Sequence, residues 1–286
     1  MAEQIETKVK QTIQEYKLFT KQDRVAVAAS GGKDSSSLLY ILKHLGYNIT
    51  AVTVDAHIGN YTAENLANLR AFCKEHGIKL VELSFREEFG GSLGHILSHL
   101  HSNGVKLNSC SVCGVLRRYI INKFARCNSF SIVATGHNMD DEAEATLMNI
   151  FRNDIARFAR QGVIPGITWH EGFVQRVKPL YFCSELEITA FSKKHKLPVK
   201  YGRCPYASNA YRFHVRKFIN AMEKLNKNVK HNTIGFVTEK AERLHNKFSF
   251  EIKHCKFCGE PTSTEICKTC QLISMINGDE NARVSG

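Results

Sequence analysis

The chain has 286 residues, of which 43% are hydrophobic and 23% charged, and its formal net charge is +12. This length is sufficient for a substantial core, and the ordinary composition excludes a disordered or fibrous protein. No apolar run approaches the roughly 18 residues of a membrane span, and the first residues mix charges of both signs instead of forming a signal peptide. We therefore expect a cytoplasmic protein with no membrane partner.

Positive charge is concentrated in one segment. Residues 193–256 hold 16 Lys and Arg against 4 Asp and Glu, so this segment alone accounts for the net charge of the chain. A merely solvated basic face is one interpretation of such a segment. A polyanionic partner is the other, because contacts to several phosphates release counterions and dominate affinity.

The chain has ten cysteines, and no secretion signal is recognisable at its start. Because thiols stay reduced in proteins that are not secreted, metal or redox chemistry is favoured over disulfides. Three of them stand singly among apolar neighbours and are interpreted as small buried side chains, namely Cys73, Cys127 and Cys183. The others form a pair, an isolated residue and a quartet: Cys110 and Cys113, then Cys204, then Cys255, Cys258, Cys267 and Cys270.

Secondary structure is expected to alternate along the first half of the chain. An amphipathic helix opens the chain, and β-prone runs follow at residues 24–29, 49–54, 79–83 and 131–134, with helices at about 33–45 and 63–76 between them. Such alternation predicts an α/β fold, a parallel sheet with helices on both faces. Ligands in such folds bind beyond the carboxyl ends of the strands.

Two further helices are expected from apolar spacing. Residues 139–161 form one, with Asp140, Asp141 and Glu142 in its first turn, where acidic groups suit the helix dipole. Residues 207–226 form the other, and its Arg212 and Arg216 lie one turn apart, where they can line a groove.

The segment from Ser30 to Ser36, SGGKDSS, lies where a strand gives way to a helix. Backbone N–H groups and the helix dipole hold anions at such a place, and glycines permit close approach. The segment lacks the GxxxxGK[ST] pattern of enzymes that release the γ-phosphate, so a different cleavage is implied. A turn of the same composition without any chemistry is the alternative.

This SGGKDS run resembles the PP-loop of the N-type ATP pyrophosphatases, which split ATP between the α and β phosphates and transfer AMP to a carbonyl oxygen. A second landmark of that family, a glycine-containing loop after a later strand, is matched by residues 134–143, ATGHNMDDEA. Two landmarks in the right order favour this family over a turn without chemistry.

Within that family, CSVCGVLRR at 110–118 and GRCPY at 202–206 resemble the tRNA thiolation enzymes that make 2-thiouridine or 2-thiocytidine. The resemblance extends from about Val25 to Cys270. It implies that Cys110, Cys113 and Cys204 hold a [4Fe-4S] cluster whose fourth iron can accept sulfide. By itself the Cys110–Cys113 pair fits zinc or a dithiol equally well.

The quartet Cys255-x2-Cys258-x8-Cys267-x2-Cys270 has the spacing of a closed tetrahedral Zn²⁺ site. This ribbon narrows the resemblance to the 2-thiouridine branch. One departure from that branch is visible: relatives usually begin with another cysteine-rich zinc module, whereas this sequence has no cysteine before Cys73. Neither the mode of tRNA docking nor the sulfur donor follows from the sequence.

Residue roles follow from the resemblance. The loop would cradle the pyrophosphate of ATP, and Ala29, Val54 and Gly136 would approach the nucleotide. Asp34 and Asp141 would bind Mg²⁺, and Lys33 and Arg117 would stabilise the departing charge. A solvated or hydrogen-bonded role is expected for His57 and His137, which flank these loops. The expected residues of the phosphate-binding loop are Ser30, Gly31, Gly32, Lys33, Asp34, Ser35 and Ser36. The expected tRNA-binding residues are Arg212, Arg216 and Lys217.

The predicted function is ATP-dependent adenylation of a tRNA uridine O2, followed by sulfur transfer to C2 from cluster-bound sulfide or from a persulfide on Cys110, Cys113 or Cys204. The alternatives are 2-thiocytidine synthesis, an amidating or lysine-ligating synthetase, and a non-catalytic RNA-binding module. The expected partners are tRNA, a sulfur donor (sulfide or a ubiquitin-like sulfur carrier protein) and a second copy in a homodimer.

Five regions are expected along the chain. In order they are an N-terminal helix, the PP-loop domain, a basic helical tRNA-binding region, a zinc ribbon and a loose tail, at residues 1–22, 23–200, 201–250, 251–274 and 275–286.

Overall fold

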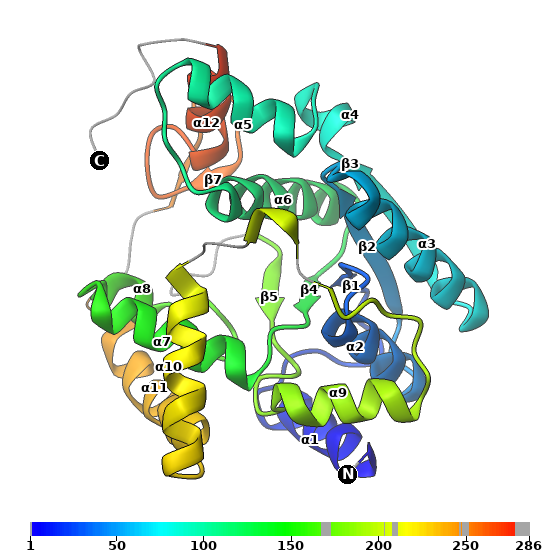
Figure 1. The fold of residues 1–286 in the computed structure, drawn as a ribbon. Coiled ribbons are helices and arrows are strands. Elements are labelled where there is room, and N and C mark those ends of the chain that lie inside the picture. Colours follow the sequence, from blue (N-terminus) through cyan, green and yellow to red (C-terminus); the bar gives the residue numbers. More distant parts are fainter. Residues whose placement is uncertain are drawn as a thin grey trace.

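A five-stranded parallel sheet lies at the centre of the molecule in a computed structural model that describes residues 2–166, 173–202, 204–207, 211–245, 247 and 252–277 (Figure 1). The strand order is β3-β2-β1-β4-β5. The strands are β1 (Val25–Ala28), β2 (Ile49–Asp55), β3 (Lys79–Ser84), β4 (Ile132–Thr135) and β5 (Gln175–Val177). In register, Val27 lies between Ala51 and Ala134. In this order β2 and β3 lie on one side of β1, and β4 and β5 lie on its other side. The direction of the strand order thus reverses between β1 and β4, and in such sheets ligands bind at the carboxyl ends of the two strands at the reversal.

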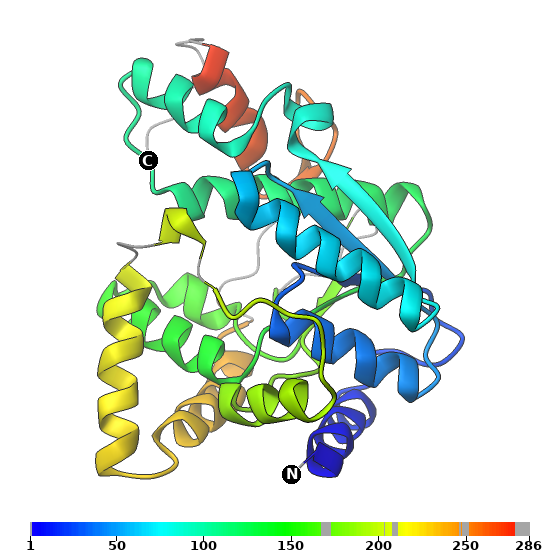
Figure 2. The ribbon, with the colours of Figure 1, turned by 45° about the vertical axis from the view of Figure 1, so that its right-hand side comes forward.

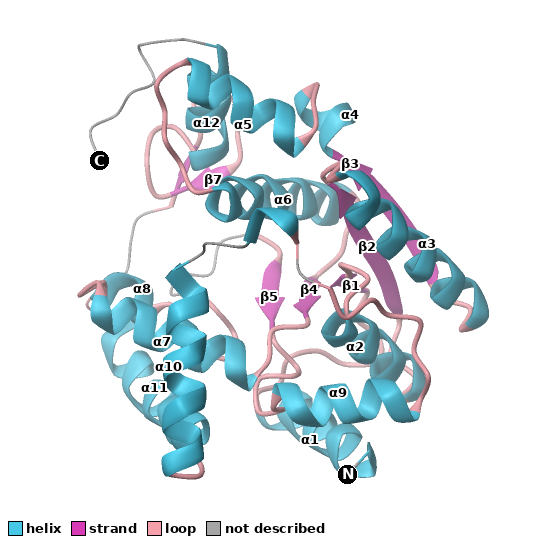
Figure 3. Cartoon of the chain, in the orientation of Figure 1, coloured by secondary structure: helices cyan, strands magenta, loops and turns pink. Residues whose placement is uncertain are grey.

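Helices cover both faces of the sheet, as the alternating pattern predicted (Figure 3). One face carries α1 (Ala2–Glu15), α2 (Lys33–His44), α3 (Gly59–Glu75) and α9 (Glu185–Lys194). Their apolar side chains pack with Val25, Val27 and Ala51 in the largest core cluster. Because both faces are covered, strands such as β1 are apolar throughout instead of alternating.

The other face carries α6 (Ser109–Cys127), which packs on β2 and β4. Beyond it lie α4 (Phe85–Phe89), α5 (Leu93–Ser102) and α12 (Lys268–Asn277), and Figures 1 and 2 both show α5 and α12 side by side. Val112, Leu116 and Ile120 of α6 share one core cluster with these helices. The N-terminal end of α6 is thereby held over the carboxyl edge of the sheet.

A group of four helices stands beside the sheet, made of α7 (Met139–Phe151), α8 (Ile155–Ala159), α10 (Tyr211–Leu225) and α11 (Val229–His245) (Figure 1). The prediction of a single helix over residues 139–161 is wrong, because α7 and α8 are separate helices. Asn153 adopts a positive φ of 52°, which breaks the helix, and the Asp154 side chain caps a new one by accepting from the Arg157 N–H at 2.9 Å. No helix among the described residues has the length and apolarity needed to cross a bilayer.

The C-terminal ribbon contains a short antiparallel pair, β6 (Lys253–His254) and β7 (Pro261–Thr262), before α12. The loose tail was expected from residue 275, but Met275, Ile276 and Asn277 complete α12. Met275 and Ile276 pack on α5 and α6, and the Asn103 side chain donates to both of their carbonyls at 2.8 and 2.9 Å. Residues 278–286 of the expected tail lie outside the described part.

Candidate active site and metal centres

The loop after β1 is shaped by glycines. Gly31 adopts a φ of 76°, and a side chain there would meet the Asn65 carbonyl oxygen at 2.5 Å. Gly32 is the N-cap of α2 and no side chain caps this helix, so its first N–H groups face outward for a ligand. The Ser35 hydroxyl ties the loop together, because it accepts from the Ser30 N–H at 3.1 Å and donates to the Gly32 carbonyl at 3.2 Å. This is the geometry of an anion site.

The second loop presses against the first. A Cβ on Gly136 would lie 2.9 Å from the Ser35 backbone nitrogen, so only glycine permits this approach. Asn138 then bridges two carboxylates, since its side chain donates to Asp34 at 3.0 Å and its main-chain N–H donates to Asp141 at 3.3 Å. Burial raises the pKa of Asp34, and the neighbouring Asp141 raises it further. Partly buried carboxylates joined through one asparagine are the kind of ligand that a hard divalent cation prefers.

Lys33 lies between two carboxylates. Its Nζ is 3.0 Å from Asp34 and 3.0 Å from Glu185, which begins α9. Burial lowers the pKa of Lys33, but these two carboxylates outweigh that effect and raise it. The side chain is therefore a fixed cation at the phosphate loop, held from the far side by Glu185.

Arg212 and Arg216 of α10 are paired with carboxylates of the chain itself. Both converge on Glu144, which is 1% exposed, with Nε–O distances of 2.6 and 2.5 Å. Arg212 also contacts Asp141 at 3.0 Å. These arginines therefore anchor α10 on the acidic face of α7, and any contact with tRNA would compete with these ion pairs. Lys217 is exposed and lies over the Phe213 ring.

The three cysteines of the pair and the isolated position meet in one cavity of about 330 Å³. Cys110 and Cys113 lie in the first turns of α6, and Cys204 precedes a short helix, Pro205–Ala207. That short helix is held on α6, because the Ser109 hydroxyl donates to the Tyr206 carbonyl at 3.0 Å. Burial and then the other two thiols raise the pKa of Cys110, so a cation or a metal cluster would relieve the repulsion between three thiolates.

The same cavity reaches the phosphate loop, the loop after β1. Ser30, Val54 and Arg117 line it together with the three cysteines. Arg117 fixes the arrangement, because its guanidinium donates to the Val54 carbonyl at 2.7 Å and to the Cys113 sulfur at 3.2 Å. Asp34, Asp141 and Gly136 are not among the residues that line it. The first residue of the loop after β1 therefore shares one cavity with the three thiols.

Two flanking histidines have hydrogen-bonded roles, as expected. His57 lies 3.3 Å from Asp55 and 2.9 Å from the Ser84 hydroxyl, and His137 lies 2.9 Å from the Thr135 hydroxyl. Of the three single cysteines, Cys73 and Cys183 are buried. The expectation of burial is wrong for Cys127, which is exposed because it ends α6, where the helix leaves the core.

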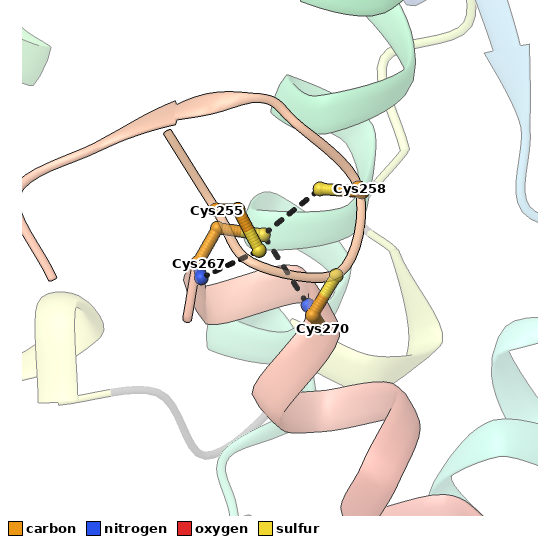
Figure 4. Close-up of side chains that lie close together, drawn as sticks. All are labelled: Cys255, Cys258, Cys267 and Cys270. Carbon is orange, nitrogen blue, oxygen red and sulfur yellow. Dashed lines mark hydrogen bonds between the residues drawn. The ribbon is translucent and has the colours of Figure 1, made fainter. Parts of the chain in front are cut away.

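The C-terminal quartet forms a compact cluster (Figure 4). Its four sulfurs lie within 4.8 Å of one another, as a tetrahedral zinc site requires, and Gly259 makes the turn after the first pair with a φ of 71°. The Cys255 sulfur accepts from the Cys267 N–H at 3.2 Å. Although burial raises the pKa of Cys255, backbone N–H groups outweigh it and lower this pKa to about 6. The ligand set fits Zn²⁺.

The ribbon is joined to α6 by a buried carboxylate. Glu260 accepts from the Asn122 side chain at 2.9 Å and pairs with Arg126, while its carbonyl accepts from the Cys255 N–H at 2.9 Å. Asn122 in turn accepts from the N–H of Val174, next to β5. The helix that carries the cavity cysteines is thus supported by the ribbon.

Some residues of the site were missed in the sequence. Glu144 lies three residues after Asp141 on one helix face, and this spacing was a usable signal. Asn138 also had one, as an N-cap. Glu185 and Asn65 carried none, because only the tertiary structure brings them to the loop after β1.

The PP-loop domain family matches residues 1–222 of the chain. A curated relative, tRNA-5-methyluridine(54) 2-sulfurtransferase of Pyrococcus horikoshii, is 36% identical over 271 residues, which are 94% of this chain and 84% of the relative. Another, cytoplasmic tRNA 2-thiolation protein 1 of Caenorhabditis elegans, is 35% identical over 281 residues, 95% of this chain and 73% of the relative.

A solved structure is similar over the same extent. The U34-tRNA thiolase NcsA from Methanococcus maripaludis, determined with its [4Fe-4S] cluster, matches with a TM-score of 0.80 and 29% identity, covering 94% of this chain and 86% of that one. Because the domain match spans most of the chain and the relatives match nearly all of it, the chain belongs to the PP-loop family, in the group of tRNA 2-thiolation proteins.

Proposed function

We propose that this chain thiolates a uridine of tRNA at C2, using ATP to activate the base. The observation that carries the proposal is the cavity shared by Ser30 and Val54 of the nucleotide side with Cys110, Cys113 and Cys204. An enzyme that only adenylates needs no thiols next to its phosphate loop. The relatives, whose names give tRNA 2-thiolation, support the same assignment.

In the first step the uridine O2 attacks the α-phosphate of ATP, an O–P bond forms and pyrophosphate leaves. The N–H groups at the start of α2 and the Lys33 ammonium would hold the phosphates, and Asp34 and Asp141 would hold Mg²⁺, which neutralises the leaving pyrophosphate. Arg117 faces the same cavity. Ala29, the last residue before the loop, donates its N–H to the Val52 carbonyl and keeps the loop at the sheet edge.

In the second step sulfur attacks C2, the C2–O bond breaks and AMP leaves. Cys110, Cys113 and Cys204 would hold a [4Fe-4S] cluster, which supplies an open iron that binds sulfide. The three thiols fit that role because they line one cavity and leave it open toward the nucleotide. The four-cysteine ribbon would hold Zn²⁺ and take no part in the reaction.

The proposal includes two sulfur donors, free sulfide and a ubiquitin-like sulfur carrier protein, and a homodimer as the working unit. Thiolation with sodium sulfide as the only sulfur source would select the first donor. Light scattering of the purified protein would test the dimer.

The deciding experiment is nucleoside mass spectrometry of tRNA after incubation with anaerobically prepared protein, ATP, Mg²⁺ and sulfide. We expect 2-thiouridine or a 5-substituted derivative, with AMP formed in equal amount. Release of AMP that depends on tRNA, without any thiolated nucleoside, would contradict the proposal and favour an amidating or ligating enzyme.

A further inference from the structure

A second cavity of about 630 Å³ lies on the other side of α6 from the nucleotide loop. Its walls come from α6, β5, the segment after α8 and the ribbon. It is larger than the cysteine cavity and within the range of about 300–1,000 Å³ typical of ligand sites. Neither step of the reaction proposed above uses it.

Two arginines line this cavity, Arg118 of α6 and Arg176 of β5. Neither makes an ion pair with any described residue. The Arg176 guanidinium donates to the Arg118 carbonyl at 3.1 Å. Desolvation and then the nearby Arg118 cation lower the pKa of Arg176 to about 10. Two cations are thus held close together, and no carboxylate in the described part of the chain pairs with either of them.

Other arginines near the site are neutralised within the chain. Arg212 and Arg216 share Glu144, and Arg126 pairs with Glu260. Glu260 also lines the second cavity, but Arg126 and the Asn122 amide already occupy its oxygens. As far as the described residues go, no carboxylate neutralises Arg118 and Arg176, and their charge is open to a ligand that brings its own negative charge.

The cavity adjoins the reaction site. The Arg118 guanidinium lies over Gly114, where an added Cβ would be 3.2 Å from Nη1, and Gly114 itself lines the cysteine cavity. The successive residues Arg117 and Arg118 thus face the two cavities on either side of α6. The two cavities therefore come close to each other at Gly114.

Aromatic surface accompanies the charge. Tyr119 and Phe173 line the cavity, and burial raises the pKa of Tyr119, so its phenol stays neutral. Guanidinium groups next to aromatic rings are the combination that binds phosphates and stacks bases of RNA strands. A small inorganic anion would need the charge but not the rings or the volume.

We propose that Arg118 and Arg176 bind a phosphodiester group of the substrate RNA in this cavity, beside the nucleotide whose base enters the cysteine cavity. The inference rests on the proposed function, because it takes tRNA as the substrate. It also gives the ribbon a second role, since Pro261, Ser263 and Thr269 form one wall of the same cavity.

The test is the affinity of unmodified tRNA transcript for the full chain, measured by fluorescence anisotropy across a salt series without ATP. For Arg118→Ala we expect about tenfold weaker binding, and a slope of log affinity against log salt reduced by about one. Arg118→Lys should keep most of the slope, because the charge remains. Arg70→Ala is the matched control, an exposed arginine paired with Glu82 away from the cavity.

Melting curves and ATP binding check that each variant is folded. If Arg176→Ala disturbs α6 through its lost hydrogen bond, Arg118→Ala still decides, because none of the hydrogen bonds above uses its guanidinium. Unchanged tRNA affinity and salt slope in Arg118→Ala and in the double variant would overturn the inference. Because binding is measured without chemistry, a failure of thiolation in the unmodified protein would leave this result standing by itself.

Discussion

Two cysteine groups lie at α6 and differ in how completely they are enclosed. In the ribbon, Cys255, Cys267 and Cys270 are less than 10% exposed, and backbone N–H groups point at the sulfurs. In the cavity, Cys110 is exposed and Cys113 and Cys204 are half-buried. Four ligands, of which only Cys258 is partly exposed, suit a structural metal site, whereas three ligands around a cavity leave room for a reactant. Number of ligands and exposure, more than residue type, separate the two roles.

The largest expected effect comes from removing any one of the three cavity cysteines. Alanine at Cys110, Cys113 or Cys204 should abolish thiolation and bound iron while sparing ATP binding, because the phosphate loop uses no thiol. Iron analysis, nucleoside mass spectrometry and nucleotide titration measure the three properties separately. Cys127→Ala is the control, since Cys127 is an exposed cysteine outside both groups. Full thiolation in all three variants would assign the sulfur transfer to another site.

A second prediction separates the step that precedes the cysteines. Asp34→Ala and Asp141→Ala should each lower tRNA-dependent AMP formation by about a hundredfold or more, because a single electrostatic group in a transition state has that value. The iron content should stay normal, because neither carboxylate lines the cavity of the three thiols. Asp154→Ala, which removes the cap of α8 and the ion pair of that cap with Arg157, is the control. Near-normal AMP formation in the Asp34 variant would contradict its assignment as a metal ligand.

The four ribbon cysteines should affect the three cavity cysteines only through α6. Cys258→Ser should lose zinc, leave nucleotide binding intact and lower the iron content, because the ribbon packs on the helix that carries Cys110. Glu260→Gln should cost about 1–3 kcal/mol of unfolding free energy, the value of a buried charged hydrogen bond. Glu265→Gln is the control, an exposed ribbon carboxylate paired with Lys256. Equal stability of the two glutamine variants would show that Glu260 does not join the ribbon to α6.

The smallest effect concerns the single cysteines. Burial raises the pKa of Cys73 to about 11 and that of Cys183 to about 12, so both remain thiols well above neutral pH. Alkylation requires the thiolate, and native protein at pH 8 should react at exposed Cys127 long before either of them. Peptide mass spectrometry over a time course with iodoacetamide gives the order. Early labelling of Cys183 would mean that its surroundings open in solution.

The α/β pattern and the two loops could be predicted because each depends on local signals. Apolar runs such as β1 and the glycine-rich turn after it are contiguous in sequence. The break at Asn153 was missed, because residues on both sides of it keep apolar spacing and only the backbone conformation interrupts the helix. The basic segment was interpreted from charge alone, which does not show that Arg212 and Arg216 are already paired with Glu144.

The sequence by itself determined the chemistry that is available: a phosphate loop, a cysteine pair, a distant third cysteine and a quartet with zinc spacing. Motifs of this kind are readable because each requires specific residue types at short separations. Only the tertiary structure decided which groups share a cavity, which charges are neutralised and which are left over. Cys204 meets Cys110, and Arg118 meets Arg176, across separations of many residues, because the packing of α6 on the sheet and the ribbon places them together. Such contacts are set by the burial of apolar surface throughout the molecule and leave no mark near the residues themselves.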